Sequence, residues 1–261
     1  MRNDIFDLET SSTRVAPGRR EAMITENWNT PNKTPNGGYL LALMLRALAT
    51  DMPHADPLVA AVSFFKPGTP GAAVLESETL RAGRRISTGE TRLRQAETTV
   101  AHLTASFRDR AHASGRTEEF GTPPDLPPPE DCFDPSGYLA GMSIGDRIDY
   151  RFAAPPGWAL GKPSGDPSAR YWVRLAEDRP VNLFGLAFLV DAYPPALTEI
   201  GEPAAVTVQL TVNLYRQPER GWLACSVSTK HLIDGYHEED MEIWDSAGRL
   251  VAQSRQLALL I

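Results

Sequence analysis

The feature that most constrains the fold of this chain is a repeat of its turn and strand signals, because those of the second half recur at a fixed distance from those of the first. Landmarks 151 residues apart are Pro67 and Pro218, the turns at 83–85 and 234–236, and the hairpin turns at 94–97 and 245–248. A strand that begins Val-Ala follows each hairpin, at Val100 and at Val251. This constant spacing predicts that one sheet-bearing unit occurs twice.

Each repeat also contains one strongly apolar segment ahead of its main strands. Residues 38–50 and 182–193 are apolar on most faces, which predicts buried helices. Asn182 is suited to cap the second helix, and Pro194 to stop it.

About four long strands are expected after each helix, and the alternation is clearest in the second half. The predicted apolar face comprises Val208, Leu210, Val212 and Leu214, and the polar face Thr207, Gln209, Thr211 and Asn213. An apolar sheet face requires a covering layer, which the helix supplies. We therefore expect an α+β fold in which a helix wrapped by a curved antiparallel sheet occurs twice.

A Pro-rich stretch separates the two repeats. The densest part, residues 121–130, cannot pair in a sheet or continue a helix. We predict an N-terminal unit over residues 1–110, a connector over 111–147 and a C-terminal unit over 148–261.

Composition excludes several classes of function. The chain has 261 residues with 26 Lys and Arg against 33 Asp and Glu, a net charge of −7. Binding to nucleic acid is not expected, because neutralisation of phosphates supplies most of its non-specific affinity. No apolar run reaches the roughly 18 residues of a membrane span, and the N-terminus is acidic and lacks the apolar core of a secretory signal. The two distant cysteines, Cys132 and Cys225, fit neither a disulfide framework nor a zinc site, which favours the cytoplasm.

Three segments resemble acyl-CoA thioesterase II-like proteins, which have the double hot-dog fold. They are Asn36-Gly37-Gly38-Tyr39 at the start of the first helix, the Arg-x-Gly-Arg segment within 80–88, and the closing hairpin over 242–256. The resemblance covers most of residues 20–260 apart from the connector. It implies a double hot-dog fold, a thioester hydrolase activity and an acyl-CoA or related thioester as the substrate, with no cofactor or metal.

The resemblance also implies a catalytic group of an Asp, a hydroxyl residue and a Gln in the second half. The Gln corresponds to Gln256, the hydroxyl residue to Thr229, and the Asp position to Gln209, which is a departure from the family. An amide cannot accept a proton from water at neutral pH. Another acid would then be needed, and the candidates are Asp191, Glu199, Asp240 and Glu242.

Four further residues are candidates for binding the substrate. If the family mechanism holds, backbone N–H groups at Gly37 and Gly38 would stabilise the oxyanion formed when water attacks the thioester. Arg84 and Arg85 could contact the phosphates of CoA, because guanidinium groups suit such anions. Each of these residues also has a purely structural interpretation, a tight helix start for the glycines and a solvated strand end for the arginines.

Two other motifs suggest different chemistry but lack its expected context. Residues 141–145 match the G-x-S-x-G nucleophile elbow, yet a Pro-rich connector precedes the motif and a strand is predicted after it. His231 and His237 lie among acidic residues, but their spacing is not that of helical zinc ligands. A polar turn explains the second cluster better.

Three functions therefore remain open at this stage. The first is thioester hydrolysis. The second is a non-catalytic module that binds acyl-CoA or an acyl chain, favoured by Gln209 at the Asp position. The third is another hot-dog reaction such as enoyl-thioester hydration, which would need an acid–base pair near the start of the first helix. A homo-oligomer is also possible, because sheet edges in such folds often pair between chains.

Overall fold

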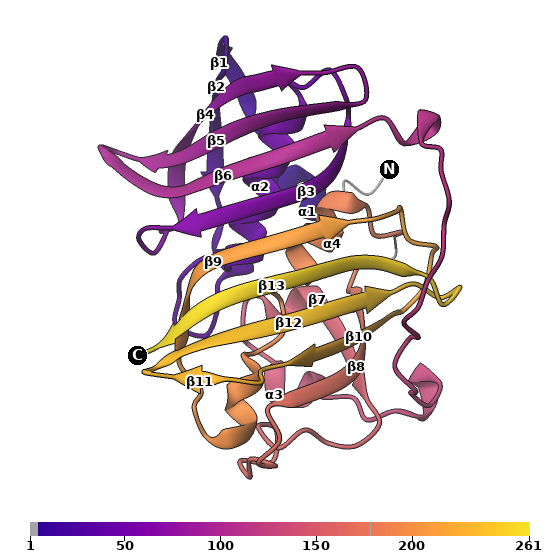
Figure 1. The fold of residues 1–261 in the computed structure, drawn as a ribbon. Helices are drawn as coiled ribbons and strands as arrows, with labels where there is room; N and C mark the ends of the chain where they lie inside the picture. Colours follow the sequence, from indigo (N-terminus) through magenta and orange to yellow (C-terminus); the bar gives the residue numbers. More distant parts are fainter. Residues whose placement is uncertain (1–4, 178) are drawn as a thin grey trace.

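A single antiparallel sheet runs through the whole molecule in the computed structural model, which describes residues 5–177 and 179–261 (Figure 1). The strands of the first half are β1 (Thr13–Ala16), β2 (Arg19–Ile24), β3 (Asp56–Phe64), β4 (Gly71–Ala82), β5 (Ile86–Gln95) and β6 (Thr98–Arg108). Those of the second half are β7 (Ile148–Phe152), β8 (Ser168–Leu175), β9 (Ala205–Leu214), β10 (Leu223–Ser228), β11 (Leu232–Ile233), β12 (Tyr236–Trp244) and β13 (Leu250–Leu260).

The order of the strands shows the duplication directly. From the edge to the centre, the first half runs β1-β2-β4-β5-β6-β3, and the second runs β7-β8-β10-β12-β13-β9, with β11 attached to β12. The halves join through β3 and β9, where Ala60 pairs with Val212 and Ala61 with Thr211. A shift of 151 residues exchanges these two pairs, so the junction has the approximate two-fold symmetry that the repeat spacing predicts.

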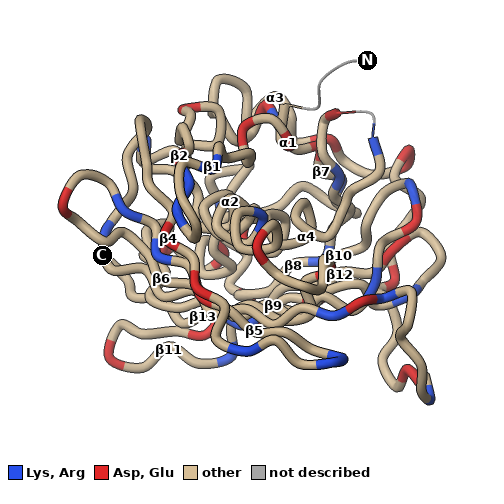
Figure 2. Tube along the Cα trace, turned by 90° about the horizontal axis from the view of Figure 1, so that it is seen from above, with Lys and Arg blue, Asp and Glu red and all other residues tan. Residues whose placement is uncertain are grey.

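Two buried helices lie side by side on one face of the sheet (Figure 2). They are α2 (Gly37–Ala49) and α4 (Leu183–Leu189), and almost every side chain of α2 is fully buried. Asn36 caps α2 by accepting from Tyr39 N at 3.0 Å, and Asn182 caps α4 by accepting from Gly185 N at 2.8 Å. The α+β layout expected from the sequence is therefore confirmed.

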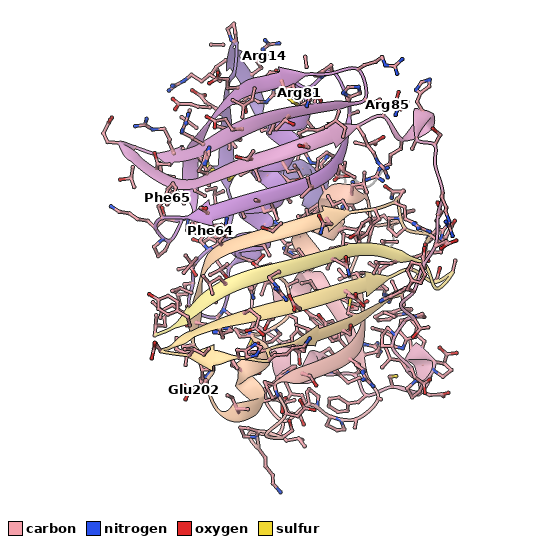
Figure 3. All side chains as sticks on the ribbon, viewed as in Figure 1. Arg14, Phe64, Phe65, Arg81, Arg85 and Glu202 are labelled. Atoms are coloured by element: carbon pink, nitrogen blue, oxygen red, sulfur yellow. The ribbon has the colours of Figure 1, made fainter. Side chains whose placement is uncertain are left out.

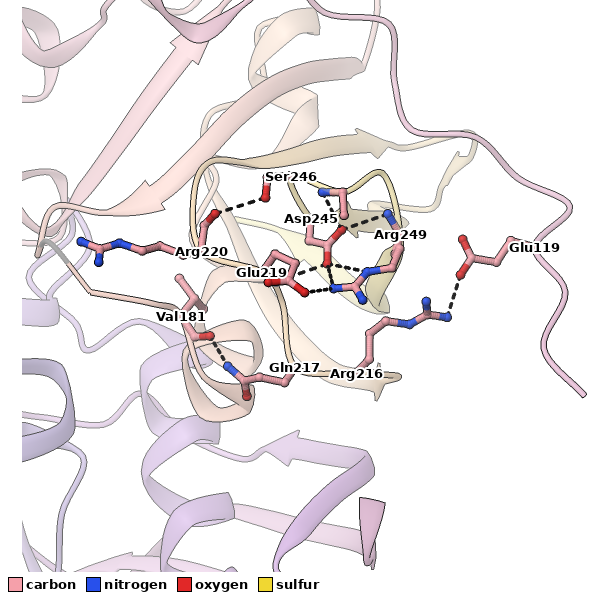
Figure 4. Close-up of polar contacts among 10 residues, drawn as sticks. Glu119, Val181, Arg216, Gln217, Glu219, Arg220, Asp245, Ser246 and Arg249 are labelled. Carbon is pink, nitrogen blue, oxygen red and sulfur yellow. Dashed lines mark hydrogen bonds and ion pairs between the residues drawn. The ribbon is translucent and has the colours of Figure 1, made fainter. Parts of the chain in front are cut away.

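The interval between β6 and β7 carries no long element. It contains α3 (Ser136–Leu139) and three short 3-10 helices, η2 (Arg110–His112), η3 (Pro129–Asp131) and η4 (Gly145–Arg147). An ion pair of 2.6 Å between Glu119 and Arg216 holds it against the second half (Figure 4). A hydrogen bond of 2.8 Å from Trp172 to the carbonyl of Pro127 does the same. The segment is therefore a strap fixed to the surface of the second half.

The structure departs from the sequence-based expectation in two elements. The second helix ends at Leu189 instead of continuing to 193, and a short helix, η5 (Ala196–Ile200), follows Pro194 and Pro195. Two strands also precede each helix, and of these only β7, the strand predicted after residues 141–145, was expected. β1 and β2 are short and largely exposed, and so lack the strong alternation by which a strand is recognised. β8 does alternate, with Tyr171, Val173 and Leu175 buried, and was missed despite this pattern. The remaining helices are α1 (Ile5–Glu9) and η1 (Glu26–Trp28).

Candidate active site

The first part of the site is the N-terminus of α2, which lies against the C-terminal end of α4. A Cβ atom added to Gly38 would lie 2.5 Å from the carbonyl oxygen of Phe188, and one added to Gly37 would lie 2.8 Å from Oδ2 of Asp191. Only glycine permits this approach of two helix ends. The paired glycines therefore place the positive end of the α2 dipole next to Asp191.

Asp191 is held by that helix end through one of its two oxygens. Its Oδ2 accepts hydrogen bonds from Gly38 N at 2.7 Å and from Asn36 Nδ2 at 3.2 Å, and its backbone carbonyl accepts from Asn36 Nδ2 at 2.7 Å. Among the described residues, no hydrogen bond reaches Oδ1. The N–H of Gly37 likewise has no acceptor among the described residues, whereas that of Gly38 is occupied by the carboxylate. The free carboxylate oxygen and the free N–H group thus belong to adjacent parts of one site.

The second part of the site is a chain of polar side chains on the inner face of the sheet. Gln256 of β13 lies opposite Glu239 of β12, and its Nε2 donates to Glu239 Oε1 at 2.9 Å. The hydroxyl of Thr207 donates to Oε1 of Gln256, also at 2.9 Å. The other oxygen of Glu239 accepts from Ala196 N, at the start of η5, at 2.6 Å. Glu239 and Gln256 are buried, and Thr207 is partly accessible.

A β-bulge brings Thr207 into this chain. Leu257 pairs with Gln209 but the next residue, Ala258, pairs with Thr207, so β9 contains one extra residue at Val208. Val208 is 38% exposed and Gln209 is also exposed, while Leu210 is fully buried. The strict alternation expected from the sequence was therefore wrong here, since Val208 does not share the apolar face of Leu210.

The two parts of the site are close enough to influence each other electrostatically. Burial raises the pKa of Asp191 to about 6, although the hydrogen bonds from Gly38 and Asn36 oppose the increase. Burial also raises the pKa of Glu239 to about 7, and the negative charge of Asp191 contributes to this increase. Two neighbouring carboxyl groups with raised pKa values are an arrangement that general acid–base chemistry uses.

Gln209 does not join the group around Gln256. Its side chain is exposed, and its backbone lies between Ser63 of β3 and Leu257 of β13. Of the four alternative acids considered from the sequence, Asp191 is the one whose carboxylate contacts the start of α2.

Thr229 is buried, and its N–H donates to the carbonyl of Pro167 at 2.9 Å. Its hydroxyl has no hydrogen-bond partner among the described residues. The hydroxyl that is bonded to Gln256 belongs to Thr207, which the sequence analysis did not single out.

Arg84 and Arg85 lie at the opposite end of α2 and β3 from the glycine pair. They precede Ile86, which pairs with Arg108 opposite Asp56 at the start of β3, whereas Phe64 at its other end contacts Gly37. Figure 3 shows Phe64 and Arg85 on opposite sides of the first half. The structure therefore does not bring these arginines together with Gly37 and Gly38.

The other three acids have structural partners. Glu199 accepts from Ser164 N at 2.9 Å and fastens the loop before β8, Asp240 is paired with Arg255, and Glu242 accepts from Gln253 at 2.7 Å. Among these alternatives, Asp191 alone lies at the start of α2.

The two competing motifs lack the required geometry. Ser143 lies in a turn between α3 and η4, with no strand leading into it, so residues 141–145 do not form a nucleophile elbow. His231 is bonded to Glu238, and the described residues contain no group of three His, Cys, Asp or Glu side chains arranged to hold a metal. Within the same residues, no helix is both long and apolar enough to cross a membrane.

A polar groove of about 550 Å³ crosses β8 to β13 away from this site. Its lining includes Arg170, Lys230, Asp240 and Arg255, but none of Asp191, Thr207, Glu239 or Gln256. We therefore place the candidate chemistry at the junction of α2, α4 and the inner sheet face.

Comparison with solved structures shows the class of fold. A protein from Thermobifida fusca assigned as a thioesterase II superposes with a TM-score of 0.87 and 28% identity, covering 100% of this chain and 99% of that one. A protein of unknown function with a hot-dog fold, from Alicyclobacillus acidocaldarius, superposes with a TM-score of 0.86 at 24% identity, covering 99% and 98%. With two such units in one chain, this protein has the double hot-dog fold.

Sequence comparison identifies the family. The model of the acyl-CoA thioesterase N-terminal domain matches residues 24–108, and that of the acyl-CoA thioesterase C-terminal domain matches residues 120–260. The chain therefore belongs to the acyl-CoA thioesterase family defined by these two domains. An uncharacterised protein of Mycobacterium tuberculosis is 28% identical over 267 residues, which cover 92% of this chain and 90% of the relative.

Proposed function

We propose that the protein hydrolyses an acyl-CoA, or a related acyl thioester, with Asp191 as the general base. The observation that carries this proposal is the position of Asp191 against the start of α2, where Gly38 N donates to its Oδ2 while, among the described residues, its Oδ1 and the N–H of Gly37 have no hydrogen-bond partner. Family membership supports the thioester class of substrate. The carboxylate of Asp191 favours hydrolysis over a non-catalytic binding module, because it offers the site an acid that position 209 lacks.

The reaction begins with a water molecule that donates one proton to Oδ1 of Asp191. The water oxygen attacks the thioester carbonyl carbon, and the carbonyl becomes an oxyanion that the N–H of Gly37 and the positive end of the α2 dipole stabilise. Collapse of the tetrahedral intermediate breaks the carbon–sulfur bond and gives the carboxylic acid. The proton held by Asp191 passes to the leaving thiolate, so the free thiol departs and Asp191 is ionised again. Because its pKa is raised to about 6, Asp191 is ionised at neutral pH and is still a stronger base than an ordinary aspartate.

The proposal is tested by measuring free-thiol release from a panel of acyl-CoAs. Turnover by the wild type and its loss by a factor of about 10² or more in Asp191→Asn is the expected result, because general-base catalysis contributes roughly that much. Gln209→Asp is the matched control, since it adds an acid at an exposed position, and we expect its rate to equal that of the wild type. Full activity in Asp191→Asn would exclude Asp191 as the base, and absence of wild-type turnover across the panel would contradict the proposed hydrolysis.

A further inference from the structure

Glu239 is the more deeply buried of the two carboxylates at the site. Glu239 is 5% exposed and lies opposite Gln256 on the neighbouring strand. Both of its oxygens face N–H donors, Ala196 N at 2.6 Å and Gln256 Nε2 at 2.9 Å. Among the described residues, the partners of this carboxylate are thus a fixed backbone group and a side-chain amide.

This pairing determines how the amide of Gln256 is oriented. At pH 8, above the raised pKa of about 7, the carboxylate of Glu239 is ionised and can only accept hydrogen bonds, so Gln256 must present its Nε2 to Glu239. Its Oε1 then faces Thr207, whose hydroxyl must donate its single proton to that oxygen, as the 2.9 Å contact shows. Donation therefore runs in one direction, from Thr207 to Gln256 to Glu239.

This direction of donation matters most at Thr207, the accessible member of the hydrogen-bonded series. Because the Thr207 proton is committed to Gln256, the Thr207 oxygen can only accept from a molecule in the site. We propose that Glu239 is a positioning residue that fixes the direction of this chain, so that Thr207 accepts a hydrogen bond from the attacking water. The proposal rests on the hydrolytic function proposed above. A water that donates one hydrogen to Thr207 and the other to Asp191 directs its lone pair at the thioester carbon.

The decisive experiment reverses the direction of hydrogen-bond donation between Thr207, Gln256 and Glu239, and then restores it. In Glu239→Gln, the new amide has one acceptor oxygen for two donors. If the backbone N–H of Ala196 retains that oxygen, the amide of Gln256 must turn over, its Nε2 must face Thr207, and the hydroxyl can no longer accept freely from water. We expect kcat to fall by about tenfold to a hundredfold, because misplacing a reactant typically costs this much. KM should change by less than about a factor of two.

Adding Gln256→Glu to that variant makes Thr207 a donor again. The carboxylate at position 256 accepts both from the amide at position 239 and from Thr207. We therefore expect kcat of the double variant to be at least about tenfold higher than that of Glu239→Gln, allowing for non-additivity between contacting residues. Glu238→Gln is the matched control, because Glu238 is the neighbouring residue of β12 but is bonded to Lys230 N and His231. Its kcat should stay at the wild-type value.

A purely structural role for Glu239 gives different results. Unchanged kcat in Glu239→Gln would overturn the proposal, as would a loss that Gln256→Glu does not reverse while both variants retain the wild-type melting temperature. If the wild type itself hydrolyses no thioester, the side-chain amide signals of Gln256 in an ¹⁵N NMR spectrum decide the matter, once assigned by their loss in Gln256→Ala. They should move in Glu239→Gln and not in Glu238→Gln, and a signal that is identical in wild type and Glu239→Gln would contradict the inferred orientation.

Discussion

The position of Asp191 resolves an apparent conflict at the scale of single residues. An acid at the C-terminal end of a helix is disfavoured by that helix's dipole, and Asp191 follows α4 directly. Its carboxylate, however, is bonded to the first turn of α2 at Gly38, where the dipole has the opposite sign. Sequence alone places Asp191 only relative to its own helix.

The activity should depend on pH through this residue. Since burial raises the pKa of Asp191 to about 6, the base is lost by protonation as the pH falls through that value. We expect kcat/KM for an acyl-CoA substrate to be level at pH 8 and to decrease about tenfold for each pH unit well below 6. A rate profile that remains flat down to pH 5 would contradict the assignment of Asp191 as the base.

The same shift predicts how stability depends on pH. A carboxyl group whose pKa rises from 3.8 to about 6 on folding stabilises the native state when protonated, and this contribution is lost as the pH rises from about 4 through 6. Asp191→Asn removes the penalty of a buried charge and should raise the free energy of unfolding at pH 8 by about 2–3 kcal/mol. Thermal unfolding at pH 8 and pH 4 measures this, and the advantage of the variant should vanish at the lower pH.

At the scale of secondary-structure elements, the site depends on the contact between two helix ends. Gly38→Ala would place a methyl group 2.5 Å from the carbonyl oxygen of Phe188. We expect a loss of about 1–3 kcal/mol of stability, as for other overpacked sites, together with reduced turnover as Asp191 moves from Gly37. Gly137→Ala, where a Cβ meets nothing within 4 Å, is the control for both measurements. Equal stability of the two variants would show that the helix ends can separate freely.

The sequence predicts the main elements of the fold but only some of the residues at the candidate site. The duplicated sheet, both helices and Gln256 at the end of the chain follow from repeat spacing, apolar periodicity and family resemblance. Thr207 does not, because the extra residue at Val208 reverses the alternation in β9, and a bulge has no clear signature in a single sequence. The two adjacent exposed positions, Val208 and Gln209, identify the bulge only once the structure is known. Glu239 was missed as well, because it lies in an acidic segment interpreted as a turn.

At the scale of the whole molecule, the site belongs to neither half alone. The glycine pair and Asn36 come from the first unit, whereas Asp191, Thr207, Glu239 and Gln256 come from the second. Asn36 donates to both the carboxylate and the carbonyl of Asp191. A residue of one unit therefore lowers the pKa of a carboxylate in the other, against the larger effect of burial.

This arrangement predicts different effects for two similar substitutions. Asn36→Ala and Asn182→Ala each remove a helix cap, with an expected cost of about 1 kcal/mol. Because the hydrogen bond from Asn36 lowers the pKa of Asp191, only Asn36→Ala should shift the acid limb of the kcat/KM profile to higher pH. Asn182→Ala should leave the position of that limb unchanged, and an equal shift in both variants would mean that the effect arises from destabilisation of the helices.

The start of α4 shows what the duplication has made possible. The residues that follow its cap are Leu183 and Phe184 in place of two glycines, and the guanidinium of Arg46 stacks 4.6 Å above the ring of Phe184. A pair of identical chains related by a two-fold axis would have to carry the same residues at both helix ends. A single chain that contains both copies is free of this constraint, so one end can keep the glycines and reactive groups while the other is filled with side chains that only support it.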